Sequence, residues 1–123
     1  MNTYYVGLLA NSEDPEEVKV AESIGVFYPN QETNGTHVNI SGIGLTKHSK
    51  NKENAIKLIE YMTGVEGQEY LSANNFEFPV NPEAKQAEIL ESWGEFKMQE
   101  LDFDKLGEHN QKAIEIFNKT GWK

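Results

Sequence analysis

The scarcity of segments with strand character is the feature that most constrains how this chain can fold. Residues 36–41 alternate polar and apolar side chains, which predicts a strand, and residues 26–28 predict a shorter one. Residues 76–80 are expected to be extended, because a residue before proline avoids helical backbone. Two or three strands make a poor sheet for a self-sufficient domain. In 123 residues, enough for one modest domain, we therefore expect an α/β fold that is rich in helices.

Helix signals occupy most of the remaining sequence. Asp14, Pro15 and Glu17 supply a cap, a first-turn proline and an acid, so a helix is predicted to start there and to stop at Gly25. The other predicted helices run from near residue 49 to Gly64, from there to residues 74–75, onward from Asn81-Pro82-Glu83, and through Leu106 and Phe117 to residues 120–121, with Trp122 folding back.

The composition excludes several classes of partner and site. With a formal net charge of -9, the chain lacks the clustered Lys and Arg that a nucleic acid or an anionic membrane surface requires. No apolar run approaches a membrane span, so no membrane insertion is expected. The absence of cysteine excludes disulfides and thiolate metal sites. The first residues lack the regions of an export signal, which would lie upstream if the protein is exported.

Two neighbouring tyrosines near the start of the chain are the candidate binding residues. Asn2 is a plausible helix N-cap, and it would put Tyr4 and Tyr5 in the first helical turn. There the free backbone N–H groups and the helix dipole favour negative charge, whether a phenolate or a bound anion. Two long side chains that leave one turn can converge on one ion. The residues alone leave open the more ordinary interpretation, in which adjacent tyrosines pack in the core and at its boundary.

Several segments, in order, carry a resemblance to a known family. The chain resembles the C-terminal part of the periplasmic ferric-iron-binding proteins, which are iron ABC transporter substrate-binding proteins with the two-lobed type II periplasmic-binding-protein fold. The similar segments are Asn2-Thr3-Tyr4-Tyr5, Ser12-Glu13-Asp14-Pro15, Gly25-Val26-Phe27-Tyr28-Pro29-Asn30, Gly35-Thr36-His37-Val38-Asn39-Ile40-Ser41-Gly42, Lys50-Asn51-Lys52-Glu53-Asn54-Ala55, Phe76-Glu77-Phe78-Pro79-Val80-Asn81-Pro82, Ser92-Trp93-Gly94 and Thr120-Gly121-Trp122-Lys123.

The resemblance implies a ligand and a role for each candidate residue. In that family two lobes close over a ferric ion (Fe3+), and paired tyrosines are phenolate ligands from one lobe. Tyr4 and Tyr5 would be those ligands, and Asn2 would hydrogen-bond a companion, synergistic anion. Ferric ion is a hard acid that suits anionic oxygen donors. A bound cation can hold a phenol deprotonated at neutral pH, although its free pKa is near 10.

The remaining chemistry-bearing residues give no second site. His37, His48 and His109 are not spaced as a ligand pair, and none matches the family's histidine ligand, so we expect surface or core positions for all three. Trp93 and Trp122 are expected to anchor helix packing. No nucleophile, base or phosphate loop is present as a motif, so no catalytic residue and no enzymatic activity are predicted.

The resemblance also implies that part of the receptor lies outside this sequence. Residues 1–36 and 86–123 would belong to the second lobe, and residues 37–85 would pack on the first, N-terminal lobe, which is otherwise absent. Three accounts stay open: a fragment of a longer gene, a subunit that pairs with a separate first half, and a rearranged or domain-swapped short protein. The implied partners are the missing lobe and an ABC permease, and the implied location is periplasmic or otherwise extracytoplasmic.

Two other functions stay open beside extracytoplasmic capture of ferric iron. A receptor on the same scaffold could use the paired tyrosines to stack on an organic ligand such as a polyamine or a sugar. Alternatively, the chain is a small helical interaction protein without metal. In that case both phenol oxygens would be buried and hydrogen-bonded within the protein.

Overall fold

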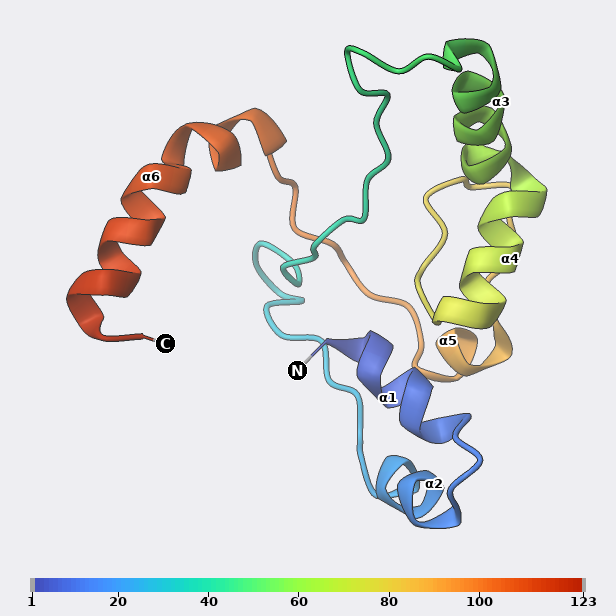
Figure 1. Cartoon of the computed structure of the whole chain (residues 1–123). Helices are drawn as coiled ribbons and strands as arrows, with labels where there is room; N and C mark the ends of the chain where they lie inside the picture. The colour runs from blue at the N-terminus through green and yellow to red at the C-terminus, as the bar shows by residue number, and fades with distance from the viewer. Residues whose placement is uncertain (1, 123) are drawn as a thin grey trace.

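The computed structural model describes residues 2–122, so Met1 and Lys123, the two ends of the predicted 1–123 domain, lie outside the description. Within this range the structure is helical, with long extended connections (Figure 1). None of the helices in the described range is both long enough and apolar enough to cross a membrane. The helices are α1 (Thr3–Ala10), α2 (Pro15–Glu22), α3 (Lys52–Thr63), α4 (Val65–Asn75), α5 (Glu88–Ser92) and α6 (Phe103–Thr120).

Two pairs of neighbouring helices build the structured part. Helix α1 contacts α2, α3 contacts α4, and α1 also reaches α4 (Figure 1). The predicted start of α2 is confirmed, since Asp14 accepts a hydrogen bond from the Glu16 backbone N–H at 2.9 Å and Pro15 opens the helix. The predicted stop at Gly64 is also confirmed, because this glycine ends α3 and precedes α4.

The helix predicted to begin at Asn81-Pro82-Glu83 is wrong in its position. These residues form a turn in which the Asn81 side chain accepts from the Glu83 N–H at 3.0 Å, and helix α5 starts only at Glu88. The backbone N–H groups of Lys85 and Ala87 donate to side chains of α4 instead of to helical carbonyls. Tertiary hydrogen bonds therefore override a sound local start signal.

The predicted strands at residues 26–28 and 36–41 do not form a sheet among residues 2–122. Both segments are extended, as are residues 77–79, but the only ladder contact found there is an isolated parallel bridge between Thr36 and Met98. The Thr36 N–H donates to the Lys97 carbonyl at 2.8 Å, and the Gln99 N–H donates to the Thr36 carbonyl at 2.8 Å. A strand needs a partner along its length, and the described chain supplies one for a single residue.

The core is small and lies where α1, α2, α4 and α5 meet. Its most buried apolar residues are Val6, Ala21 and Leu90, and Leu90 is fully buried. Ser72 of α4 is 1% exposed, and its hydroxyl accepts from the Ala87 N–H at 2.9 Å. The core is thin because the chain is short and much of its apolar surface contacts no other element of the described chain.

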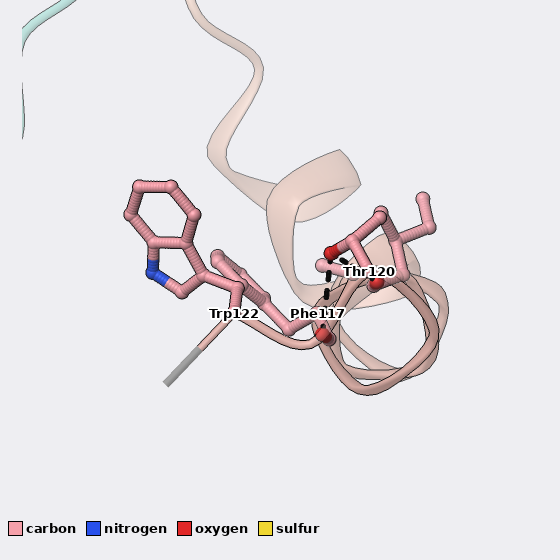
Figure 2. Close-up of a pocket in the computed structure, with 5 residues that line it drawn as sticks. Phe117, Thr120 and Trp122 are labelled. Atoms are coloured by element: carbon pink, nitrogen blue, oxygen red, sulfur yellow. Dashed lines mark hydrogen bonds between the residues drawn. The ribbon is translucent and has the colours of Figure 1, made fainter.

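Helix α6 stands apart from the other helices (Figure 1). Its end is built as predicted: Gly121 has a φ of 69°, and the Trp122 N–H donates to the Phe117 carbonyl at 3.1 Å. Figure 2 shows Trp122 beside Phe117, with the Thr120 hydroxyl bonded back into the helix. These residues line a shallow hollow of about 210 Å³. Trp122 thus packs on its own helix rather than on a neighbouring one.

Candidate ferric-ion site

The N-terminus of α1 is built as the sequence predicts. The Asn2 side-chain oxygen accepts a hydrogen bond from the Tyr4 N–H at 3.3 Å, and the Asn2 carbonyl accepts from the Tyr5 N–H at 3.2 Å. Asn2 has extended backbone and is therefore the N-cap. Tyr4 and Tyr5 lie in the first turn, where no acidic side chain already occupies the positive end of the helix dipole.

The two phenol rings lie against each other at the surface. Their centroids are 5.2 Å apart with an interplanar angle of 72°, an edge-to-face contact. Tyr5 is 54% exposed and Tyr4 is half-buried. Within residues 2–122 neither phenol oxygen has a protein hydrogen-bond partner, and neither is a buried, unpaired atom. The pair therefore lacks the buried, internally hydrogen-bonded phenol oxygens that are expected if the chain is a small helical interaction protein.

Asn39 adjoins the candidate site through its contact with Asn2, and no motif in the sequence singles it out. The Asn2 amide nitrogen lies 3.4 Å from the Asn39 side-chain oxygen, so both ends of the Asn2 carboxamide are engaged. One N–H of that amide remains for a further acceptor. The available signal was the alternation of residues 36–41, which places Asn39 among the polar positions of the segment.

One acidic residue, Glu17 of α2, lies beside the tyrosine pair. A shallow hollow beside Tyr5 is lined by Leu8, Leu9 and Glu17. The Ser12 hydroxyl donates to the Glu17 carboxylate at 2.5 Å, which holds this carboxylate near the start of α2. A negative carboxylate beside the tyrosine pair favours the approach of a cation.

Histidine contributes nothing to this site. His37, His48 and His109, expected at surface or core positions, are all exposed, and His37 Nδ1 lies 3.1 Å from the Gln99 side-chain oxygen. In the part of the chain that the structure describes, no three His, Cys, Asp or Glu residues gather as a metal-binding group.

A second group of aromatic side chains, formed by Tyr28, Phe78 and Phe96, packs together and has a structural role. The rings of Tyr28 and Phe96 stack with centroids 4.2 Å apart, and Phe78 meets Phe96 edge-on. Among residues 2–122 the Tyr28 hydroxyl is buried without a hydrogen-bond partner, and burial raises the pKa of this phenol above its usual value near 10. A buried phenol that resists ionisation is poorly suited to ligate a metal.

Known proteins with similar sequences and structures point to one kind of binding protein. Residues 6–98 match the family model described as bacterial extracellular solute-binding protein. Iron uptake protein A1 of Synechocystis sp. is 46% identical over 122 residues, which cover 99% of this chain and 34% of that protein. The Fe(3+)-binding periplasmic protein of Serratia marcescens is 29% identical over 102 residues, covering 82% of this chain and 30% of that protein.

Solved structures agree over the whole chain. The ferric binding protein from Campylobacter jejuni has a TM-score of 0.94 and 41% sequence identity, and the match covers 100% of this chain and 39% of that one. The Trichodesmium protein IdiA (FutA), solved in complex with iron and citrate ligands, has a TM-score of 0.91 and 41% identity, again over 39% of its length. This chain thus spans between about a third and two fifths of these proteins.

Proposed function

The chain belongs to the bacterial extracellular solute-binding protein family, and from this premise we propose that it is the part of a ferric-iron receptor that supplies Tyr4 and Tyr5 as phenolate ligands. The predicted fold, a helix-rich portion of a two-lobed solute-binding protein with few strands, is confirmed by the match to ferric binding proteins. The proposed activity is capture of ferric iron outside the cytoplasmic membrane for an ABC importer, without catalysis. Ferric iron is the cargo of this activity.

The single observation that carries the proposal is the geometry of the tyrosine pair. Two phenol rings leave one capped helical turn with centroids 5.2 Å apart, and their oxygens are not used inside the described chain. Phenolate oxygen is a hard, anionic donor, and a trivalent cation at this position would hold both phenols deprotonated. The names of the relatives supply the metal, since they are called iron uptake and ferric iron-binding proteins.

Asn2 is the residue proposed to meet a companion anion. Its carboxamide caps α1 and contacts Asn39, and it keeps one N–H for an acceptor close to the tyrosines. The first turn adds backbone N–H groups and the positive end of the helix dipole. An anion bound there would occupy coordination positions of the ion that two phenolates leave open.

The remainder of the receptor would supply the other ligands and the closing lobe. We assign residues 1–36 and 86–123 to the second lobe and residues 37–85 to the surface that packs on the first. Within this division α1 pairs with α2 and α3 pairs with α4, while a smaller contact between α1 and α4 crosses it. Closure of two lobes over the ion is the change that a permease would recognise.

A chimera tests the proposal in a complete receptor. In this protein, called the chimera below, the present chain replaces the matching 122 residues of Synechocystis iron uptake protein A1. Titration with ferric ion is expected to produce a visible phenolate-to-iron charge-transfer band with one ion bound per chain. A folded chimera that binds ferric ion without this band, or that carries an organic ligand and no metal after purification, would contradict the proposal.

A further inference from the structure

Asn34 and Gly35 form the one asparagine–glycine pair in the sequence, and they lie at the end of a turn. Residues 29–34 make up this turn, which Figure 1 draws as the tight cyan loop that follows α2. Asparagine is a heat-labile residue, because its side-chain amide can be lost. A following glycine has no Cβ to keep its backbone nitrogen away from that amide. Asn34, which is exposed, is therefore the position where such a loss meets the least steric hindrance.

The reaction uses only Asn34, the peptide bond that follows it, and water. The Gly35 nitrogen bonds to Cγ of Asn34, the Cγ–Nδ2 bond breaks, and the Gly35 amide proton leaves with the amide as ammonia. Water then opens the imide ring that has formed. Opening at Cγ gives aspartate, whereas opening at the main-chain carbonyl carbon gives isoaspartate, whose backbone runs through Cγ and is one atom longer. Both products carry a carboxylate in place of the amide.

The folded turn restrains the nitrogen that must attack. The Gly35 N–H donates to the Asn30 carbonyl at 2.8 Å, and the same carbonyl accepts from the Thr33 N–H at 3.0 Å. Gly35 is buried with a φ of 89°, although Asn34 beside it is exposed. The nitrogen has to lose its proton in order to attack, so its hydrogen bond must first be given up. Attack on Asn34 therefore requires a local opening of the turn.

Gly35 is enclosed too tightly for a longer backbone to fit. A Cβ placed on Gly35 would lie 2.7 Å from the Lys97 carbonyl oxygen and 2.7 Å from the Met98 carbonyl carbon. Thr36, the next residue, forms the isolated bridge to Met98 through its backbone N–H and carbonyl. An additional main-chain atom at position 34 therefore pushes Gly35 against Lys97 or breaks the pairing of Thr36.

We propose that Asn34 is a site of spontaneous deamidation that the intact turn protects, and that the isoaspartate product breaks the attachment of Thr36 to Met98. The inference is independent of iron binding, since it involves none of the residues proposed to hold the ion or its companion anion. A molecule with isoaspartate at position 34 cannot rebuild the turn around Gly35, so the change is permanent. The modification therefore marks the molecules in which this turn has opened.

Peptide mass spectrometry of the iron-free chimera tests the site and its protection. The chimera is kept in mildly alkaline buffer, with or without concentrated urea, and the conversion of Asn34 is followed with time. Conversion is expected to be about tenfold faster in urea, which is the effect of releasing one hydrogen bond. Asn39 is the control in the same digest and should stay unchanged, because the branched side chain of Ile40 hinders attack. Equal rates with and without urea would show that the turn gives no protection, and an unchanged Asn34 in urea would remove the site; either result overturns the inference.

Two substitutions in the chimera separate the longer backbone from the added charge. Asn34→Gln resists the reaction because its side chain is longer, and Asn34→Asp carries the charge of the product on a normal backbone. After prolonged warm incubation, the thermal midpoint of the parent is expected to fall as its isoaspartate content rises, whereas Asn34→Gln keeps its starting midpoint. Freshly made Asn34→Asp should melt with the fresh parent. A fresh Asn34→Asp that melts as low as the aged parent would assign the effect to charge. An aged parent that contains isoaspartate and keeps its midpoint would show that the attachment of Thr36 survives, and both outcomes contradict the proposed effect of isoaspartate.

Discussion

Gly7 of α1 and Phe76 at the end of α4 meet so closely that only a glycine fits at position 7. A Cβ added to Gly7 would lie 2.5 Å from Cγ of Phe76, and Gly7 is buried. Phe76 itself has a φ of 53°, a left-handed conformation that is unusual for an aromatic residue. The helix that carries the tyrosine pair is therefore oriented by this contact with α4.

Gly7→Ala is expected to destabilise the chimera by about 1–3 kcal/mol, because the added methyl group forces α1 and Phe76 apart. The measurement is chemical denaturation followed by circular dichroism. Gly107→Ala is the matched control, since a Cβ at Gly107 meets no neighbour within 4 Å. An exposed helical glycine replaced by alanine gains about 1 kcal/mol. Equal behaviour of the two variants would show that the close contact does not limit stability.

Tyr4→Phe and Tyr5→Phe are each expected to lower the affinity of the chimera for ferric ion by at least 100-fold, because each removes one anionic oxygen donor. The charge-transfer band should shift and weaken in each single variant and vanish in the double variant. Tyr61→Phe and Tyr70→Phe, at tyrosines that are 49% and 62% exposed, are the controls and should bind as the parent does. An unchanged band in both single variants would remove the tyrosines from the site.

Asn2→Ala is expected to cost about 1 kcal/mol of stability, because the Tyr4 N–H loses its cap. Asn2→Ser keeps a capping oxygen and loses the contact with Asn39 and the free amide N–H. If Asn2 binds the companion anion, both variants lose the effect of added citrate on iron affinity, whereas only Asn2→Ala loses stability. A citrate effect preserved in Asn2→Ser would restrict Asn2 to capping.

Tyr28→Phe is expected to leave stability at neutral pH unchanged or to raise it by up to about 1 kcal/mol, since the Tyr28 hydroxyl is buried and has no hydrogen-bond partner in the described part of the chain. The effect of pH has a definite sign. Burial raises the pKa of Tyr28 in the folded state, so the unfolded chain releases this proton first as pH rises through about 10. The parent should therefore lose stability above that pH more steeply than Tyr28→Phe. Parallel curves of unfolding free energy against pH would contradict the burial of this hydroxyl.

Features specified by neighbouring residues were predicted from the sequence. The caps at Asn2 and Asp14, the stop at Gly64 and the end of the last helix at Gly121 each depend on a few adjacent positions. The tyrosine pair belongs to this class, because its place in the first turn follows from the Asn2 cap.

Features that depend on distant residues were not predicted. The start of α5 is moved by hydrogen bonds from Lys85 and Ala87 to side chains of α4, and no local pattern records those bonds. The strand at residues 36–41 has the right alternation, yet the described chain contains no matching edge beyond Met98. Asn39 was missed for the same reason, since its partner Asn2 is 37 positions away.

The separation of α6 from the other helices affects the solubility of this chain. Phe103, Leu106 and Phe117 each expose about half of their surface, and the net charge of -9 makes copies of the chain repel one another. Dissolved salt screens this electrostatic repulsion, but it does not weaken the hydrophobic attraction between exposed apolar side chains. The turbidity of a solution of this chain is therefore expected to rise as sodium chloride is added. The chain is expected to stay monomeric in a dilute, low-salt buffer.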